Sequence, residues 1–196
     1  MQKTFFLFET HMNLSSLPHE RERRWLIDPK SLALTNLDGH PFSLITQGYL
    51  SAAGTVPVFR IRFYQDPLTQ TLTEAVQTVK APTGDGMAEV EFPIPEDAAP
   101  QLMAMATAKL TKVRYCIQHS NGQVIELDLF KGDVLEQRLI IAEIELPSFD
   151  APVTVPPWFG PEITGIRALS NVEIAYNPRA AAHLAEEILE NARNHF

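Results

Sequence analysis

The sequence predicts a protein of the α+β class that is mainly antiparallel β, with about eight strands in a barrel or a strongly curled sheet and helices packed outside. Apolar and charged residues alternate along many short segments, as in "VFRIRFY" at 58–64. This alternation has the period of a half-buried strand. Turn signals such as "APTGDG" at 81–86 and "SNG" at 120–122 separate successive segments. The order of elements is therefore that of consecutive hairpins.

The first half of the chain supplies five of the expected strands. Each is a short segment with strand alternation, and they lie at 19–27, 42–52, 56–64, 71–80 and 87–95. The last of them ends in "FPIP", and proline cannot donate a ladder hydrogen bond. We therefore expect this strand to lie at an edge of the sheet or to end early.

The second half begins with a predicted helix over 96–105, which carries Leu102, Met103 and Met105 on its apolar side. Three further strands follow at 110–118, 122–130 and 137–146, the first two joined by the "SNG" hairpin signal. The segment 147–161 contains five prolines and is expected to be an ordered but irregular crossover.

The chain ends in a predicted amphipathic helix. Asn177 is its candidate N-cap and Pro178 occupies the first helical position, where the missing N–H costs nothing. Its expected buried stripe consists of Ala181, Leu184, Ala185, Ile188 and Leu189.

Composition excludes several classes of protein. With 196 residues, of which 45% are hydrophobic, the chain suits one domain with a sizeable core. Its net charge of -8 argues against a general nucleic-acid binder. The single Cys116 excludes an intrachain disulfide and a multi-thiolate metal site. No apolar run approaches the ~18–20 residues that span a bilayer, and no signal peptide is evident, so we expect a cytoplasmic protein.

Like charges recur two residues apart within single strands. Basic pairs are Arg60 with Arg62 and Lys112 with Arg114, and Lys80 ends another strand. The acidic pairs are Glu89 with Glu91, Glu126 with Asp128, and Glu143 with Glu145, while Glu20, Glu22 and Arg24 alternate near the start. For any one strand, this pattern is most simply a solvated face.

The set as a whole indicates a binding site. Like charges this close repel by ~1 kcal/mol or more where solvent is partly excluded, unless an opposite charge lies between them. Basic pairs then point to an anion with several charges, and carboxylate pairs to a hard cation such as Mg²⁺ or Mn²⁺. A site with both suits a complex of metal and polyphosphate.

In this order, the charged segments resemble the CYTH superfamily, the triphosphate tunnel metalloenzymes. "HERERRWLI" resembles the E-x-E-x-K signature strand, with Glu20, Glu22 and Arg24 in place. "TQGYL", "FRIRF", "TVKA", "EVEF", "LTKVRY", "IELDLF" and "IIAEIELP" resemble the later strands, and "PPWFGPEITGIRALSNVEIA" resembles the closing segment. Single motifs are weak, but the ordered set runs from about residue 18 to 177 and is specific.

The resemblance implies an eight-stranded closed barrel, a tunnel lined by charged side chains. It implies three regions: an N-terminal extension of unassigned role over 1–17, the barrel domain over 18–177, and the final helix over 178–196. Phosphate would be bound by Arg24, Arg60, Arg62, Lys80, Lys112 and Arg114. Mg²⁺ or Mn²⁺ would be bound, directly or through water, by Glu20, Glu22, Glu89, Glu91, Glu126, Asp128, Glu143 and Glu145, and the catalytic set would be Glu20, Glu22 and Arg24.

The chain departs from the family pattern at two places. Arg24 replaces the signature lysine, and an arginine cannot carry a proton near neutral pH, although it grips phosphate with two donors. "GIRALSN" stands where G-D-P-R-Y-S-N is common, so contacts near Ser170 are expected to differ.

The leading functional hypothesis is metal-dependent hydrolysis of a triphosphate, above all inorganic tripolyphosphate. The alternatives are a class IV-type adenylate cyclase, an organic triphosphatase for thiamine triphosphate or nucleotides, and a polyphosphate-binding module without catalysis. The six histidines are scattered rather than paired at metal-ligand spacing, and the "GDG" turn is followed by no P-loop lysine. Beyond the substrate we expect no nucleic-acid or membrane partner, and a homodimer is the assembly left open, because outward apolar faces need covering.

Overall fold

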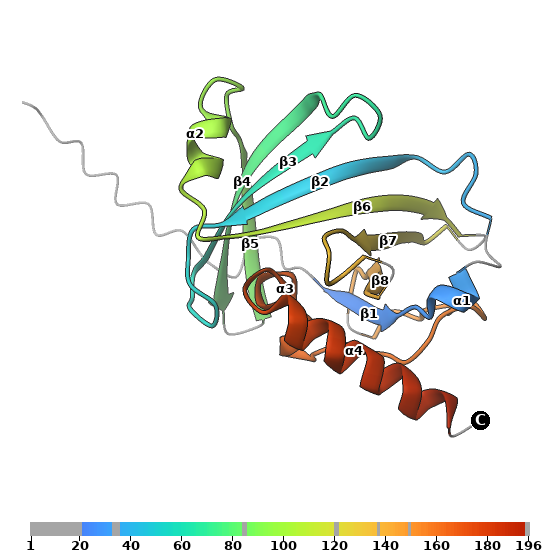
Figure 1. Ribbon diagram of the computed structural model, residues 1–196. Coiled ribbons are helices and arrows are strands. Elements are labelled where there is room, and N and C mark those ends of the chain that lie inside the picture. Colours follow the sequence, from blue (N-terminus) through green and yellow to red (C-terminus); the bar gives the residue numbers. More distant parts are fainter. Residues whose placement is uncertain are drawn as a thin grey trace, which may run out of the picture.

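The computed structural model describes residues 21–32, 36–83, 86–119, 122–136, 138–148 and 150–194. Eight strands form a single sheet in the order β1-β8-β7-β6-β2-β3-β4-β5, and all neighbouring strands are antiparallel. The sheet curls strongly, so that one face becomes the concave wall of a half-barrel (Figure 1). Among the described residues, no helix is long and apolar enough to cross a membrane.

The strands are β1 (Glu22–Leu26), β2 (Phe42–Tyr49), β3 (Val58–Gln65), β4 (Leu72–Thr83), β5 (Gly86–Pro93), β6 (Ala108–Gln118), β7 (Val124–Phe130) and β8 (Ile140–Glu145). The helices are α1 (Pro29–Leu32), α2 (Ala99–Ala104), α3 (Asn171–Tyr176), α4 (Pro178–Arg193) and the 3₁₀ helix η2 (Arg167–Leu169).

The predicted strands are confirmed with ends that shift by a few residues. The predicted start of the first strand at 19 lies outside the described residues. Helix α4 begins at Pro178 as expected, but the Asn177 side chain makes no capping hydrogen bond. Helix α3 was missed, although the Ser170 hydroxyl accepts from the Glu173 amide and "SNVE" has capping spacing. Six helical residues are too few to show a periodicity.

The closed barrel expected from the sequence is not what the described residues form. Strands β1 and β5 are the two ends of the sheet and do not pair with each other there. The outer edge of β1 is instead bonded to the segment 160–164: Gly160 and Ile163 donate to the carbonyls of Leu26 and Arg24. The architecture is therefore an open half-barrel, because a loop takes up the edge that closure would use.

The final helix lies on the side of the sheet opposite to that predicted. Residues of α4 form one core cluster with Leu26, Leu110, Phe130 and Ile141. By strand alternation these four share the concave face with Arg24, Lys112, Asp128 and Glu143. The concave face is thus charged over one part and apolar at one end, and α3 and α4 pack on the apolar end. The expectation that this helix packs outside was wrong.

The convex face of β1, β6, β7 and β8 is covered by the irregular proline-rich segment. A second core cluster joins Trp25, Ile125, Leu127 and Ile144 to residues of 151–159. The rings of Trp25 and Phe159 lie 5.1 Å apart, and those of Trp158 and Phe159 4.6 Å apart. Helix α2 does pack on the convex side, where Met103 and Ala106 lie over Gly48 of β2.

The "QGY" glycine is required by this packing, which yields a first prediction. A Cβ at Gly48 would lie 2.6 Å from the Ala106 Cβ and 2.7 Å from the Met103 Sδ. We expect Gly48→Ala to lower the free energy of unfolding by about 1–3 kcal/mol, as overpacking does. Urea denaturation of Gly48→Ala, Ala106→Gly and the double variant measures this. Because Ala106→Gly removes the closest contact, the double variant should recover part of the loss, and strict additivity would contradict the stated cause.

Candidate functional site

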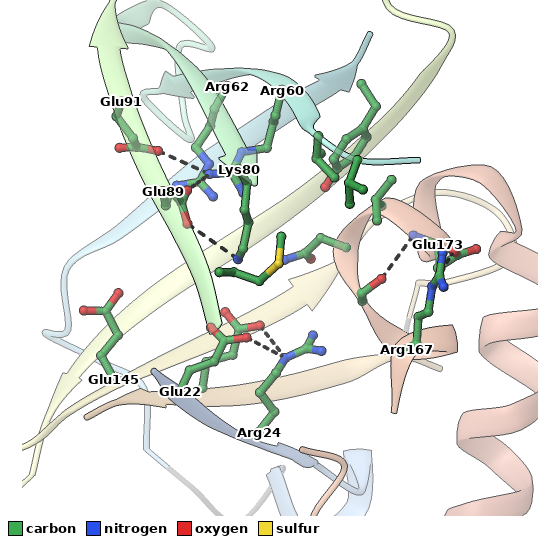
Figure 2. Close-up of a pocket in the computed structure, with 18 of the residues that line it drawn as sticks. Glu22, Arg24, Arg60, Arg62, Lys80, Glu89, Glu91, Glu145, Arg167 and Glu173 are labelled. Atoms are coloured by element: carbon green, nitrogen blue, oxygen red, sulfur yellow. Dashed lines mark hydrogen bonds and ion pairs between the residues drawn. The ribbon is translucent and has the colours of Figure 1, made fainter. Parts of the chain in front are cut away.

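The concave face encloses a cavity of about 1060 Å³ to which all eight strands contribute lining side chains. The loop between β2 and β3 and the start of α3 complete its rim with Gly54, Thr55, Val56, Asn171 and Glu173. Figure 2 shows charged side chains of β1, β3, β4 and β5 converging on it. The cavity lies over the charged part of the concave face, and α3 borders it on the side of the apolar end.

Most of the residues predicted for the site line this cavity. They are Glu22, Arg24, Arg60, Arg62, Lys80, Glu89, Glu91, Arg114, Glu126, Glu143 and Glu145. Lys112 and Asp128 do not line it: both are 0% exposed, and Asp128 is bonded to Lys112 and Arg114. Glu20 falls outside the described residues.

Strand register brings opposite charges next to each other. In the antiparallel pairs, Arg24 faces Glu143, Arg114 faces Asp128, and Lys80 faces Glu89. Side chains directly opposite on one face of a sheet are close enough to interact. These three pairs neutralise like charges that repel along a strand, whereas Glu126 faces Glu143 and Glu22 faces Glu145.

Arg114 is the centre of the largest group of ion pairs. Its Nε and Nη2 donate to the two Asp128 oxygens at 2.6 Å each, and Nη2 also donates to Glu143 at 2.7 Å. Its Nη1 donates to Glu126, and the Lys112 ammonium also donates to Asp128. Burial opposes the Arg114 charge, but Asp128, Glu143 and Glu126 raise the Arg114 pKa well above its usual value.

Burial acts in the same direction on Lys112, but there it outweighs the attraction of the carboxylates. Together with the nearby Arg114 charge, burial lowers the pKa of Lys112 to about 8, although Asp128 and Glu143 resist the change. The same two cations, with Arg24, lower the pKa of Glu143 against its burial. This part of the site holds more charge than burial alone would permit, and only the mutual pairing keeps it ionised.

A second group of charges lies on the opposite side of the cavity. Arg60 donates to Glu89 at 2.7 Å and to Glu91 at 3.2 Å, and the Lys80 Nζ lies 3.6 Å from Glu89 (Figure 2). The neighbouring Arg62 donates to the Tyr64 hydroxyl at 2.9 Å, while its buried Nε has no hydrogen-bond partner among the described residues. Arg60 therefore donates to two carboxylates, whereas Arg62 donates to a tyrosine hydroxyl.

The third group belongs to β1 and β8. Arg24 donates from Nε to Glu143 at 2.9 Å, and Glu22 lies 3.4 Å from the same nitrogen. Glu22 also faces Glu145 across the strand pair. Burial and then the charge of Glu143 raise the pKa of Glu22 to about 7, against the pull of Arg24. The cavity is therefore short of positive charge around Glu22.

Carboxylates in this arrangement fit a hard cation only in part. Among the described residues, no three candidate ligands are gathered closely enough to hold a metal ion by themselves. Mg²⁺ is, however, commonly held by one or two carboxylates together with substrate phosphates and water. Glu22, Glu143 and Glu145 offer such oxygens at the place where positive charge is lacking.

Several lining residues were not predicted from the sequence. Arg21, the residue before β1, lines the cavity, whereas Arg23 pairs with Glu162 away from it. Tyr49 is buried, and its hydroxyl accepts from Gln47 at 2.7 Å. Arg167, Asn171 and Glu173 come from η2 and α3, for which no strand pattern exists; the "SN" pair was the available signal.

Comparison with known proteins places the chain among triphosphatases. No family model matches it. It is 31% identical over 153 residues to the inorganic triphosphatase of Nitrosomonas europaea, which covers 76% of this chain and 95% of that one. It is 33% identical over 138 residues to the inorganic triphosphatase of Acetivibrio thermocellus, covering 69% and 81% of the two chains.

A solved structure agrees with these relatives. The crystal structure of an inorganic triphosphatase matches the fold with a TM-score of 0.56 and 28% identity. The match covers 81% of this chain and 95% of that chain. The fold is thus similar to that of a solved triphosphatase over most of both chains.

The buried pair of Lys112 and Asp128 gives a second prediction. Asp128 compensates both Lys112 and Arg114, so Asp128→Asn leaves two buried cations short of a carboxylate. We expect this change to lower the free energy of unfolding by about 3–5 kcal/mol. The exposed Asp133→Asn is the matched control and should change it by less than about 0.5 kcal/mol. Equal losses in urea denaturation would contradict the role of Asp128.

The raised pKa of Glu22 gives a third prediction. Because the pKa is about 7 in the folded state and 4.5 otherwise, folding favours the protonated carboxyl. The contribution of Glu22 to stability is therefore complete below pH 4.5 and is lost as the pH rises through 7. Without metal, Glu22→Gln should gain about 2–3 kcal/mol of stability relative to the parent between pH 4.5 and 8.

Urea denaturation in EDTA, at about pH 4.5 and about pH 8, measures the stability of Glu22→Gln relative to the parent. The exposed Glu187→Gln of α4 serves as the control and should show no such change. A stability difference between Glu22→Gln and the parent that is the same at both pH values would contradict the assignment.

Proposed function

The chain belongs to the family of inorganic triphosphatases within the CYTH superfamily, and on that premise we propose that its cavity hydrolyses inorganic tripolyphosphate with the help of a divalent cation. One observation carries the proposal: a single cavity contains guanidinium, ammonium and carboxylate groups from facing strands, already paired with one another. A complex of metal and triphosphate presents the same two signs of charge and can replace both halves of these pairs.

Arg60, Arg62, Lys80 and Arg114 are the proposed phosphate ligands. Arg24, the remaining predicted cation that lines the cavity, already donates to Glu143 and to the Leu169 carbonyl. Guanidinium groups bind phosphate oxygens with two parallel donors, which fixes orientation as well as charge. Arg62 is the first candidate, because it need not release a hydrogen-bonded carboxylate. Arg60 and Arg114 would exchange Glu89 and Glu143 for phosphate oxygens, and the carboxylates so freed become available to a cation.

The proposed metal ligands that line the cavity are Glu22, Glu89, Glu91, Glu126, Glu143 and Glu145. These carboxylates would hold Mg²⁺ or Mn²⁺, which would neutralise charge on the phosphate oxygens and polarise water. Water attacks the terminal phosphorus, the bond to the bridging oxygen breaks, and orthophosphate and diphosphate leave. A cavity carboxylate accepts the proton of the water, and the arginines stabilise the charge on the equatorial oxygens.

Closure of the half-barrel into a tunnel around the substrate remains a prediction. It would bring β5 towards β1, but the outward backbone groups of Arg24 and Leu26 are already bonded to 160–163. Pairing of β1 with β5 is therefore restricted to the part of β1 before Arg24. The segment 160–164 would remain between the two edges over the rest.

An organic triphosphate is the second candidate substrate, and the size of the cavity favours it. At about 1060 Å³ the cavity lies at the upper end of the range for drug-sized ligands, which are larger than tripolyphosphate. Val56, Val58 and Met87 add an apolar portion to the lining. This lining would suit an adenylate cyclase or a thiamine or nucleoside triphosphatase, whereas a module without catalysis would bind triphosphate and release nothing.

A fourth prediction tests the activity. The protein should release phosphate from tripolyphosphate with Mg²⁺ or Mn²⁺, and EDTA should abolish release. Arg62→Gln should lower kcat/KM by about 10²–10³-fold, because a donor to the transferred group is lost without leaving a carboxylate unpaired. The matched control is Arg138→Gln, whose exposed side chain pairs with Glu186 of α4 at 3.0 Å.

ATP and thiamine triphosphate are assayed in parallel. Faster turnover of either would favour the organic substrate. Tight binding of tripolyphosphate without turnover of any compound would contradict hydrolysis and favour the binding module.

A further inference from the structure

The side chain of Arg24 connects two parts of the molecule that are far apart in sequence. Its Nε donates to Glu143 of β8 at 2.9 Å, and its Nη2 donates to the carbonyl of Leu169 at 3.0 Å. The residue is 7% exposed, so both bonds are shielded from water. In Figure 2 Arg24 extends from β1 between Glu22 and the helical segment that carries Arg167 and Glu173.

The Leu169 carbonyl that Arg24 binds lies at the junction between η2 and α3. Leu169 ends η2, and the next residue, Ser170, caps α3 through its hydroxyl. Arg167, Asn171 and Glu173 of these two elements form the outer wall of the cavity. The Asn171 Oδ1 is buried and has no hydrogen-bond partner among the described residues. The wall thus presents polar groups to the cavity, and their positions there depend on where η2 and α3 lie.

A lysine could not reproduce this connection. The guanidinium presents donors in a rigid fork, so one nitrogen can hold a carboxylate while another holds a carbonyl in a different direction. An ammonium is a point charge at the end of a flexible chain. At this position, where the resembling signature has lysine, a lysine could neutralise Glu143 or reach Leu169, but would not hold both.

We propose that Arg24 is a positioning residue that holds η2 and the first turn of α3, the outer wall of the cavity, against the carboxylates of β1 and β8. Its effect on catalysis rests on the proposed function, since the wall is placed to contact the end of a bound triphosphate. Its effect on the wall itself does not depend on any activity.

The neighbouring Arg23 provides a matched control. It lies on the opposite face of the same strand and holds Glu162 with both nitrogens, at 2.8 and 2.5 Å. Arg23 therefore holds the connection between β8 and α3 at Glu162, whereas Arg24 holds it at Leu169. Arg23 does not line the cavity. Arg23→Lys and Arg24→Lys make the same chemical change at adjacent positions.

Amide hydrogen exchange resolved by peptide tests the proposal directly. The amides of Leu169, Ser170 and Ile174 are bonded to Ile166, Arg167 and Ser170, so their exchange reports opening of the wall. In Arg24→Lys, exchange over 166–174 should become about tenfold faster, as expected for loss of a hydrogen bond to a charged donor. Arg23→Lys should leave exchange over 166–174 unchanged.

Steady-state hydrolysis of tripolyphosphate is measured on the same proteins. Arg24→Lys should raise KM and lower kcat/KM by about tenfold or more, because the wall is no longer held in place. Arg23→Lys should retain the parent values. Arg24→Gln is the second variant, and its amides over 166–174 should exchange as fast as those of Arg24→Lys. Equal exchange in a charged and an uncharged variant would show that the hydrogen bonds of Arg24, and not its charge alone, hold the wall.

Two results would overturn the proposal. Unchanged exchange over 166–174 in both Arg24 variants would show that the wall does not depend on this side chain. Faster hydrolysis by Arg24→Lys with a protected wall would show that the position serves the reaction directly. If the parent hydrolyses nothing while the wall still opens in Arg24→Lys, the proposed function fails and the positioning role stands.

Discussion

The constraint on which this structure depends is the neutralisation of charge that the strands turn inward. Asp128 is fully buried between Lys112 and Arg114, and Arg114 in turn holds Glu126 and Glu143. An uncompensated charge in this place would cost several kcal/mol. The register between β6, β7 and β8 therefore has to be the one observed, because a slip of one residue would move every charge to the other face.

The same pairing determines how the free cavity can respond to a ligand. Most of its cations already hold carboxylates, and most of its carboxylates already hold cations. A phosphate without metal would leave carboxylates unpaired, and a metal without phosphate would do the same to arginines. Under the proposed function, metal and triphosphate would therefore bind better together than either would bind alone, as a consequence of burial and charge.

Connecting segments complete the architecture. The segment 151–159 covers convex apolar strands, and 160–164 occupies the outer edge of β1. Helices α3 and α4 pack on the apolar end of the concave face and so border the cavity. The outer wall of the cavity thus comes from the end of the chain and is joined to the carboxylate cluster through Arg24.

The sequence by itself determined the strands, their hairpin order and the face on which each charged pair lies, because alternation with period two is a local property. It also identified Glu22, Arg24, Arg60, Arg62 and Glu143 as neighbours of one site, and the structure brings them to one cavity. Only the tertiary structure decided that Lys112 and Asp128 are fully buried and do not line it, since burial depends on which side chains cover them. The open edge, the place of α4 and the outer wall were likewise decided by packing between residues more than a hundred positions apart, such as Arg24 and Leu169, which no local pattern encodes.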